Sequence, residues 1–168
     1  DYYDAEPGDG PHAGLALARM ISQITFRTDR VFTDKFGRDE VEPLSGDFGL
    51  WDRFQVERYL EHHGDKLVRR FDANSYLYLT RVMDYFEPFA DEEAAVALLR
   101  RVSTRFLVVS FDTDWRFDTA HSRELVRVLS AHRVPVTFRE ISSPWGHDSF
   151  LLVVPDYHQT VATFLRRV

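Results

Sequence analysis

Residues 105–117 read Arg105-Phe-Leu-Val-Val-Ser-Phe-Asp-Thr-Asp-Trp-Arg-Phe117. The continuous apolar run Phe106–Phe111 is typical of a β-strand that is covered on both faces. Residues 119–132 then repeat apolar side chains at helical spacing, and residues 135–141 alternate as in a second strand. This order predicts a β-α-β unit with two parallel, adjacent strands, followed by a closing helix over residues 150–168.

Acidic residues and a histidine follow the two predicted strands. Asp112 and Asp114 come after the first strand, and Trp145-Gly-His147-Asp comes after the second. Ligands of open parallel sheets bind beyond the carboxyl ends of the strands. A catalytic histidine needs an acid that fixes its tautomer and stabilises its charged form. We prefer Asp114 to Asp112 as this acid, because Asp112 follows the strand directly and can serve the turn.

The same residues also have a plainer structural interpretation. An aspartate after a strand is often a turn or cap residue, and a lone histidine is usually structural. The joint position of Asp114 and His147 at the ends of neighbouring strands favours chemistry instead. An acid followed by a histidine is the second half of the Ser…Asp…His order of α/β-hydrolase enzymes. No G-x-S-x-G turn occurs in the 168 residues, so the nucleophile is expected on polypeptide outside them.

The hydrophobic pattern divides the chain near residue 104. We expect a loop over residues 1–10, a helical region over 11–103, and the C-terminal part of an α/β core over 104–168. Two parallel strands with helices on one side make a poor free-standing sheet. The chain is therefore expected to start within a domain whose other strands lie in polypeptide outside this sequence.

Local signals predict the elements of the helical region. Apolar spacing indicates a helix over residues 12–27 and another from 54 to a stop at Gly64. Residues 28–50 are polar and punctuated by Gly and Pro, which predicts a long loop. Asn74 and Asp91 are expected to cap two further helices.

Composition excludes several classes of function. The net charge of −6 disfavours a general nucleic-acid binder, which would be basic. The chain has 0 cysteines and no H-E-x-x-H motif, so we expect no disulfide, no cysteine nucleophile and no metal. No apolar run approaches about 18 residues, and no signal-peptide pattern is present, which predicts a cytoplasmic protein that does not enter a membrane.

Seven blocks of sequence carry further information. They are Gly14-Leu-Ala-Leu-Ala-Arg-Met-Ile21, Ile24-Thr-Phe-Arg27, Val56-Glu-Arg-Tyr-Leu60, His63-Gly-Asp-Lys66, Arg70-Phe-Asp-Ala-Asn-Ser-Tyr-Leu-Tyr-Leu-Thr80, Asp114-Trp115 and Gly146-His-Asp-Ser-Phe-Leu151. These blocks resemble the homoserine O-acetyltransferase family of α/β-hydrolase-fold enzymes, which also contains homoserine and serine O-succinyltransferases. They occur in family order and cover nearly the whole chain.

This resemblance implies roles for four residues. Asp114 and His147 are the expected acid and base of a triad whose serine lies upstream. Arg19 is expected to hold the carboxylate of the amino-acid substrate and Asp148 its ammonium group, which suits a zwitterion. Each of the last two has a structural alternative: Arg19 as a surface or salt-bridged residue, and Asp148 as the cap of the last helix. Phe26 stands where the family often has a tyrosine, which leaves the choice among homoserine, serine and related alcohols open.

The resemblance further implies acyl transfer from acetyl-CoA, or alternatively succinyl-CoA, to the hydroxyl of L-homoserine in methionine biosynthesis, with no bound cofactor. The region over residues 11–103 is expected to be a helical lid, which the family also uses to form homodimers. The expected partners are homoserine, acyl-CoA and the missing N-terminal part of the same enzyme, without which this chain is inactive. The alternatives are an esterase or thioesterase of the same fold, and a non-catalytic fragment.

Overall fold

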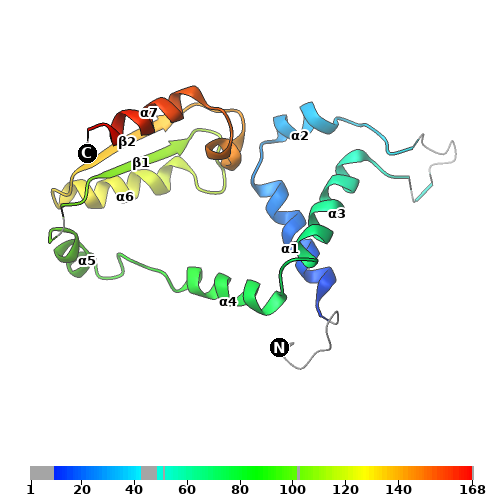
Figure 1. Cartoon of the computed structure of the whole chain (residues 1–168), viewed down its shortest axis with the longest axis horizontal. Coiled ribbons are helices and arrows are strands. Elements are labelled where there is room, and N and C mark those ends of the chain that lie inside the picture. The colour runs from blue at the N-terminus through cyan, green and yellow to red at the C-terminus, as the bar shows by residue number, and fades with distance from the viewer. Residues whose placement is uncertain (1–9, 43–48, 51, 102, 168) are drawn as a thin grey trace. The chain divides into compact units, whose positions relative to one another are not determined.

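The structure is a computed structural model that describes residues 10–42, 49–50, 52–101 and 103–167. Apart from Gly10, the loop expected over residues 1–10 lies outside these residues. The described backbone forms seven α-helices, one 3-10 helix and two strands (Figure 1): α1 (His12–Thr25), α2 (Asp29–Phe36), α3 (Gln55–Val68), α4 (Ala73–Asp84), α5 (Glu92–Leu99), β1 (Phe106–Phe111), α6 (Thr119–Ala131), β2 (Val136–Ile141), η1 (Gly146–Leu151) and α7 (Pro155–Leu165).

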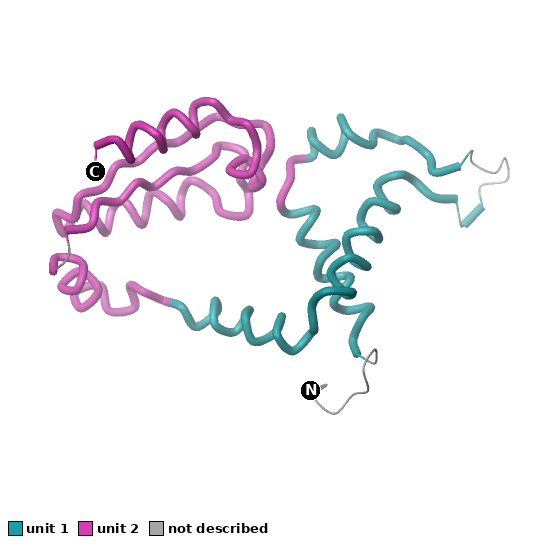
Figure 2. Tube along the Cα trace, in the orientation of Figure 1, with its two compact units in different colours: residues 1–25, 29–86 teal, residues 26–28, 87–168 magenta. Residues whose placement is uncertain are grey.

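The chain divides into two compact units (Figure 2). The first comprises residues 1–25 and 29–86 and contains α1 to α4. The second comprises residues 26–28 and 87–168 and contains both strands together with α5, α6, η1 and α7. Residues 26–28 thus belong to the strand-bearing unit, although α1 and α2 flank them in the sequence.

In the first unit, α1 packs along α3 at Gly64. The prediction that α3 stops at Gly64 is wrong, because the helix continues to Val68. A Cβ atom on Gly64 would lie 3.0 Å from Cε of Met20 and 3.1 Å from Cβ of Ala16. The glycine therefore serves the close approach of two helices rather than the end of one.

The long loop predicted over residues 28–50 is also wrong in part, because Asp29–Phe36 forms α2. Phe32 and Phe36 lie one helical turn apart, with ring centroids 5.8 Å from each other. Both rings pack against Tyr59 of α3, with centroids at 6.3 and 4.9 Å. This aromatic contact stabilises a short helix whose apolar positions are too few among its polar residues for the sequence pattern to reveal it.

Aspartates cap the next two helices. The cap predicted at Asn74 is wrong, because Oδ1 of Asp72 accepts the N–H of Ser75 at 2.8 Å and begins α4. Hydrogen bonds from the side chain and backbone of Ser75 hold the pKa of Asp72 below its usual range. The cap predicted at Asp91 is confirmed, with Oδ1 accepting the N–H of Ala94 at 2.9 Å.

The predicted β-α-β unit is confirmed. β1 and β2 pair in parallel, in a register that runs from Phe106 opposite Val136 to Phe111 opposite Ile141. The closing helix is shorter than predicted, because the 3-10 helix η1 takes residues 146–151 and α7 begins at Pro155. None of the helices in the described part of the chain is both long and apolar enough for a membrane crossing.

Helices lie against both faces of the strand pair rather than on one side (Figure 1). Phe111 of β1 packs with Tyr157 of α7 at a centroid distance of 5.6 Å. Ser110, the preceding residue, points to the opposite face and accepts a hydrogen bond from Thr119 of α6 at 3.0 Å. Since each face of β1 has its own helix, the apolar strand is covered as its sequence predicts.

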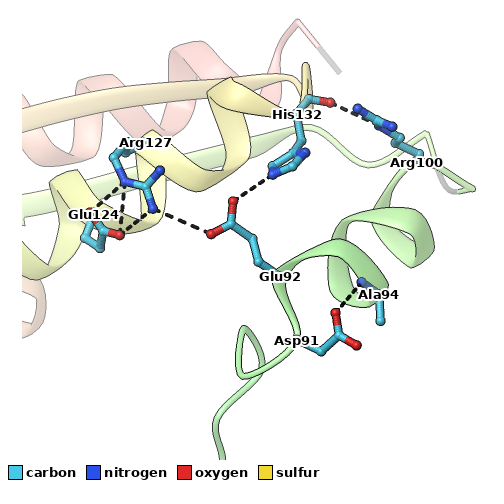
Figure 3. Close-up of polar contacts among 7 residues, drawn as sticks. All are labelled: Asp91, Glu92, Ala94, Arg100, Glu124, Arg127 and His132. Atoms are coloured by element: carbon cyan, nitrogen blue, oxygen red, sulfur yellow. Dashed lines mark hydrogen bonds and ion pairs between the residues drawn. The ribbon is translucent and has the colours of Figure 1, made fainter.

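Polar side chains tie α5 to α6 in the second unit (Figure 3). Oε1 of Glu92 lies 2.7 Å from Nε2 of His132, and Oε2 lies 3.6 Å from Nη2 of Arg127. Arg127 also binds Glu124, and its hydrogen bonds hold the pKa of that carboxyl below the usual range. Nε of Arg100 donates to the carbonyl of His132 at 3.2 Å. α5 is thus joined to α6 by charged and polar groups.

Candidate active site

Asp114 lies in the turn that follows β1. Its N–H donates to the carbonyl of Phe111 at 3.1 Å, and the residue is only 7% exposed. Oδ1 of Asp114 accepts the backbone N–H groups of Arg116 at 3.1 Å and Phe117 at 3.0 Å. Two fixed donors on one oxygen orient the carboxylate and leave Oδ2 for another donor.

His147 supplies that donor from η1, which follows β2. Nδ1 of His147 lies 2.8 Å from Oδ2 of Asp114, and the two side chains are 23% and 8% exposed. Because a carboxylate only accepts, Nδ1 carries the proton and donates a hydrogen bond to Oδ2 of Asp114. Nε2 is then the basic atom of the ring. The structure thus brings together the two residues that the sequence analysis paired, and their catalytic roles stay a prediction.

Asp112 has a different place in the same region. Its Oδ1 accepts the N–H of Ser143 at 2.9 Å, and its own N–H donates to the carbonyl of Ile141 at 3.1 Å. Asp112 therefore joins the loops that follow the two strands and does not contact His147 through any bond shown by the described residues. This is the turn-serving position that the sequence analysis considered for it.

Hydroxyl groups fasten the two loops further. The Thr113 hydroxyl donates to the carbonyl of Ser143 and accepts the N–H of Gly146 at 3.1 Å. Ser149 is fully buried, and its hydroxyl lies 2.8 Å from Oγ of Ser143 and donates to the carbonyl of Gly146. The loop that presents His147 is thus tied to the loop that presents Asp114 by bonds other than the His–Asp contact itself.

Gly146 is required by its backbone conformation and by its neighbours. Its φ is +65°, in the left-handed region that side chains disfavour. A Cβ atom there would lie 3.1 Å from the carbonyl oxygen of Phe26 and 3.3 Å from Cα of Arg27. These neighbours are backbone atoms, which cannot move aside as the end of a flexible side chain can.

We expect Gly146→Ala to destabilise the protein by about 1–3 kcal/mol, from left-handed strain and the backbone clash together. Urea unfolding followed by tryptophan fluorescence measures this, since Trp115 and Trp145 both lie in the second unit. Gly14→Ala is the matched control, because Gly14 is helical and has no atom within 4 Å of an added Cβ. Equal unfolding midpoints for Gly146→Ala and the parent protein would contradict the prediction.

Aromatic rings surround His147. The centroids of Phe26, Phe117 and Phe150 lie 5.5, 5.2 and 5.4 Å from that of the imidazole. His147 and two of these rings, those of Phe117 and Phe150, also line a cavity of about 380 Å³ together with β1 residues such as Val109. Apolar rings thus flank the imidazole of His147, whose side chain remains 23% exposed.

The remaining predicted residues differ in their position. Asp148 lies in the second unit next to His147, and its Oδ2 forms an ion pair of 3.1 Å with Nη2 of Arg27. The alternative in which Asp148 caps the last helix is wrong, because α7 begins at Pro155 after Val154. Arg19 is half-buried on α1 in the first unit, and its part in a site with His147 stays a prediction.

The contact of residues 26–28 with the loop of His147 was not predicted from the sequence, although Phe26 was noted there as a departure from the family. The segment contacts the His147 loop through the Phe26 ring and through the Arg27–Asp148 ion pair. No local pattern signals a contact between residues so far apart in the chain. The one available signal was the block that contains Phe26 and Arg27, which stands out only by its resemblance to a family.

The chain is similar to curated proteins over nearly its whole length. It is 49% identical over 172 residues to a homoserine O-succinyltransferase of Magnetococcus marinus, covering 99% of this chain and 43% of that protein. It is 46% identical over 166 residues to a homoserine O-acetyltransferase of Zymomonas mobilis, covering 98% of this chain and 44% of that protein. The chain therefore spans less than half the length of these curated relatives. No protein-family model matches the sequence.

Solved structures support the fold. The crystal structure of esterase E22 has a TM-score of 0.74 at 20% identity, over 95% of this chain and 44% of the esterase chain. The homoserine O-acetyltransferase of Bacillus anthracis has a TM-score of 0.68 at 19% identity, over 84% of this chain and 38% of its own. Both likenesses confirm the expected partial α/β-hydrolase fold. With identities of 46–49% to relatives over nearly its whole length, the chain belongs to the family of homoserine O-acetyltransferases and O-succinyltransferases.

Proposed function

We propose that this chain provides the acid and base of an enzyme that transfers an acyl group from acyl-CoA to the hydroxyl of L-homoserine. The observation that carries the proposal is the contact of 2.8 Å between Nδ1 of His147 and Oδ2 of Asp114, at the carboxyl ends of two parallel strands. Both residues lie in a chain 46% identical to a protein named homoserine O-acetyltransferase. Acetyl-CoA is the donor we favour, with succinyl-CoA as the alternative.

The nucleophile is proposed to be a serine on polypeptide outside the 168 residues. In the part of the chain that the structure describes, β1 pairs only with β2, although five of its six residues are apolar. A parallel strand of this kind usually has neighbours on both sides. The relatives are also more than twice as long as the matched region. The complete enzyme, meaning this chain together with the serine-bearing polypeptide, is therefore the species expected to be active.

The mechanism has two half-reactions. The serine oxygen attacks the thioester carbonyl while Nε2 of His147 takes the serine proton. The C–S bond breaks, and CoA leaves as a thiol with that proton. The homoserine hydroxyl then attacks the acyl-serine ester, its proton passes to Nε2, and the proton returns to the serine as the ester breaks. Asp114 keeps the ring oriented and stabilises the imidazolium in both steps.

Binding of the amino acid is assigned to one cation and one anion. Arg19 holds the carboxylate and Asp148 the ammonium group, so the zwitterion is oriented by its two ends. Phe26 packs on the imidazole and offers no hydroxyl to the substrate. The acceptor is therefore recognised through its charged ends more than through a hydrogen bond at position 26.

The helical region over residues 11–103 is proposed to act as a lid that excludes water, which otherwise hydrolyses the acyl-serine. α4 exposes Leu77, Val82 and Met83, each more than half accessible. Apolar side chains that gather on one exposed helix favour contact with another protein surface, which agrees with a homodimer. A place in methionine biosynthesis in the cytoplasm completes the proposal.

Release of CoA thiol by the complete enzyme tests the proposal. The donor is acetyl-CoA or succinyl-CoA, and the acceptor is homoserine, serine or water alone. We expect thiol release from acetyl-CoA to depend on homoserine, with O-acetylhomoserine as the product identified by mass spectrometry. Release at the same rate with and without an amino acid would instead identify a thioesterase. A preference for succinyl-CoA would change the donor and keep the reaction.

A further inference from the structure

Residues 26–28 form a short segment that is bound to the loop of His147. The carbonyl of Phe26 accepts the N–H of Asp148 at 3.1 Å, and the Thr28 hydroxyl donates to the carbonyl of Pro144 at 2.8 Å. The segment therefore binds the loop at residues before and after His147. The backbone of Gly146 approaches it so closely that a side chain there has no room.

The same segment also contacts the loop of Asp114. Nε1 of Trp115 donates to the carbonyl of Arg27 at 3.3 Å. The guanidinium of Arg116 lies 5.1 Å from the ring centroid of Phe26, at cation–π distance. Residues 26–28 thus touch the loops of both members of the His–Asp pair, while belonging to neither strand.

The side chain of Arg27 has a separate partner. Its Nη2 lies 3.1 Å from Oδ2 of Asp148, and the two side chains are 24% and 16% exposed. A carboxylate that is this far buried is costly without a cation or hydrogen-bond donors. Arg27 supplies that compensation. Its carbonyl accepts the indole N–H of Trp115, and the carbonyl of the preceding residue, Phe26, accepts the N–H of Asp148.

We propose that Arg27 is a positioning residue that orients the carboxylate of Asp148 for the ammonium group of the acceptor. This inference rests on the proposed function. An aspartate carboxylate can accept about four hydrogen bonds, so a guanidinium on Oδ2 leaves capacity for a second cation. The contacts shown for Arg27 are with Asp148 and Trp115. Arg27 therefore governs binding of the amino acid and not acylation of the serine.

Two variants of the complete enzyme test this. We expect Arg27→Met to raise KM for homoserine by about tenfold or more, as the loss of a charge-assisted contact predicts. Hydrolysis of p-nitrophenyl acetate, which requires the serine, His147 and Asp114 but no ammonium site, is expected to fall much less than kcat/KM for homoserine. Arg27→Lys keeps the positive charge but lacks the planar guanidinium. Its KM for homoserine is expected to lie between that of Arg27→Met and that of the parent.

The control is Arg30→Met, which removes an arginine that is three-quarters exposed and paired with Asp34 on α2. Its KM for homoserine is expected to match that of the parent. Equal losses of ester hydrolysis and homoserine transfer in Arg27→Met would overturn the inference by assigning Arg27 a merely structural role. An unchanged KM for homoserine would overturn it as well. Failure of the proposed function is distinguishable, because the parent enzyme would then hydrolyse the ester and acylate no homoserine.

Discussion

Alanine in place of His147 is expected to lower kcat for acyl transfer in the complete enzyme by about 10⁴-fold to 10⁶-fold. Every proton that moves in the two half-reactions passes through Nε2 of this ring. The ring is held by Asp114 on its other nitrogen and by three phenyl groups around it. Among the bonds described, His147 is the histidine paired with Asp114, so its loss removes the oriented base.

Steady-state release of CoA thiol at saturating homoserine measures this loss. KM for acetyl-CoA is expected to change little, because an interaction made only in the transition state lowers kcat. His121→Ala is the matched control, since His121 is largely exposed on α6 and pairs only with Asp118 among the bonds described. A His147→Ala enzyme that keeps more than about one-tenth of the parental kcat would rule out this ring as the base.

The sequence alone was sufficient for the pairing of Asp114 with His147. The apolar run of β1 and the alternation of β2 each depend on a few consecutive residues, and the intervening helix makes the strands parallel. Parallel strands place their carboxyl ends at one edge, so two distant residues meet without any further information. The same reasoning identified the closing helix but not η1, because six residues of 3-10 helix carry no periodic signal.

The contacts that the sequence did not predict are those between helices and between distant loops. From the local sequence, Gly64 resembles the end of a helix. Its role in packing becomes evident only because Met20 and Ala16 of α1 lie against it. The ion pair between Arg27 and Asp148 joins residues that no periodicity relates. Such contacts depend on the tertiary arrangement, which helix propensity and the spacing of apolar residues do not determine.

Asp114→Asn is expected to lower kcat by about 10⁴-fold, as loss of the correct histidine tautomer does in triad enzymes. The new amide can adopt two orientations. In the first, its oxygen keeps the N–H donors of Arg116 and Phe117, and its NH₂ group faces Nδ1 of His147. Nδ1 must then accept, so the ring proton moves to Nε2 and the base is lost.

In the second orientation of this amide, its oxygen faces His147 and the tautomer is correct. The NH₂ group then lies against the N–H groups of Arg116 and Phe117, which are 3.1 and 3.0 Å from the present carboxylate oxygen. These two N–H groups would then lose their acceptor and face the hydrogens of the amide, so the first orientation is the more stable one. The backbone of the acid loop therefore dictates that an amide at this position misplaces the proton.

Steady-state kinetics of Asp114→Asn, compared with those of Asp112→Asn, separates the misplaced imidazole proton from a general loosening of the two loops. Asp112 accepts only the N–H of Ser143 among the described side-chain bonds, and an asparagine oxygen can replace that acceptor. Asp112→Asn is thus expected to keep kcat within about tenfold of the parent. Nitrogen NMR of the imidazole should show the proton on Nδ1 in the parent and on Nε2 in Asp114→Asn. A proton that stays on Nδ1 while kcat falls would show that the charge of Asp114, and not its control of the tautomer, sustains the reaction.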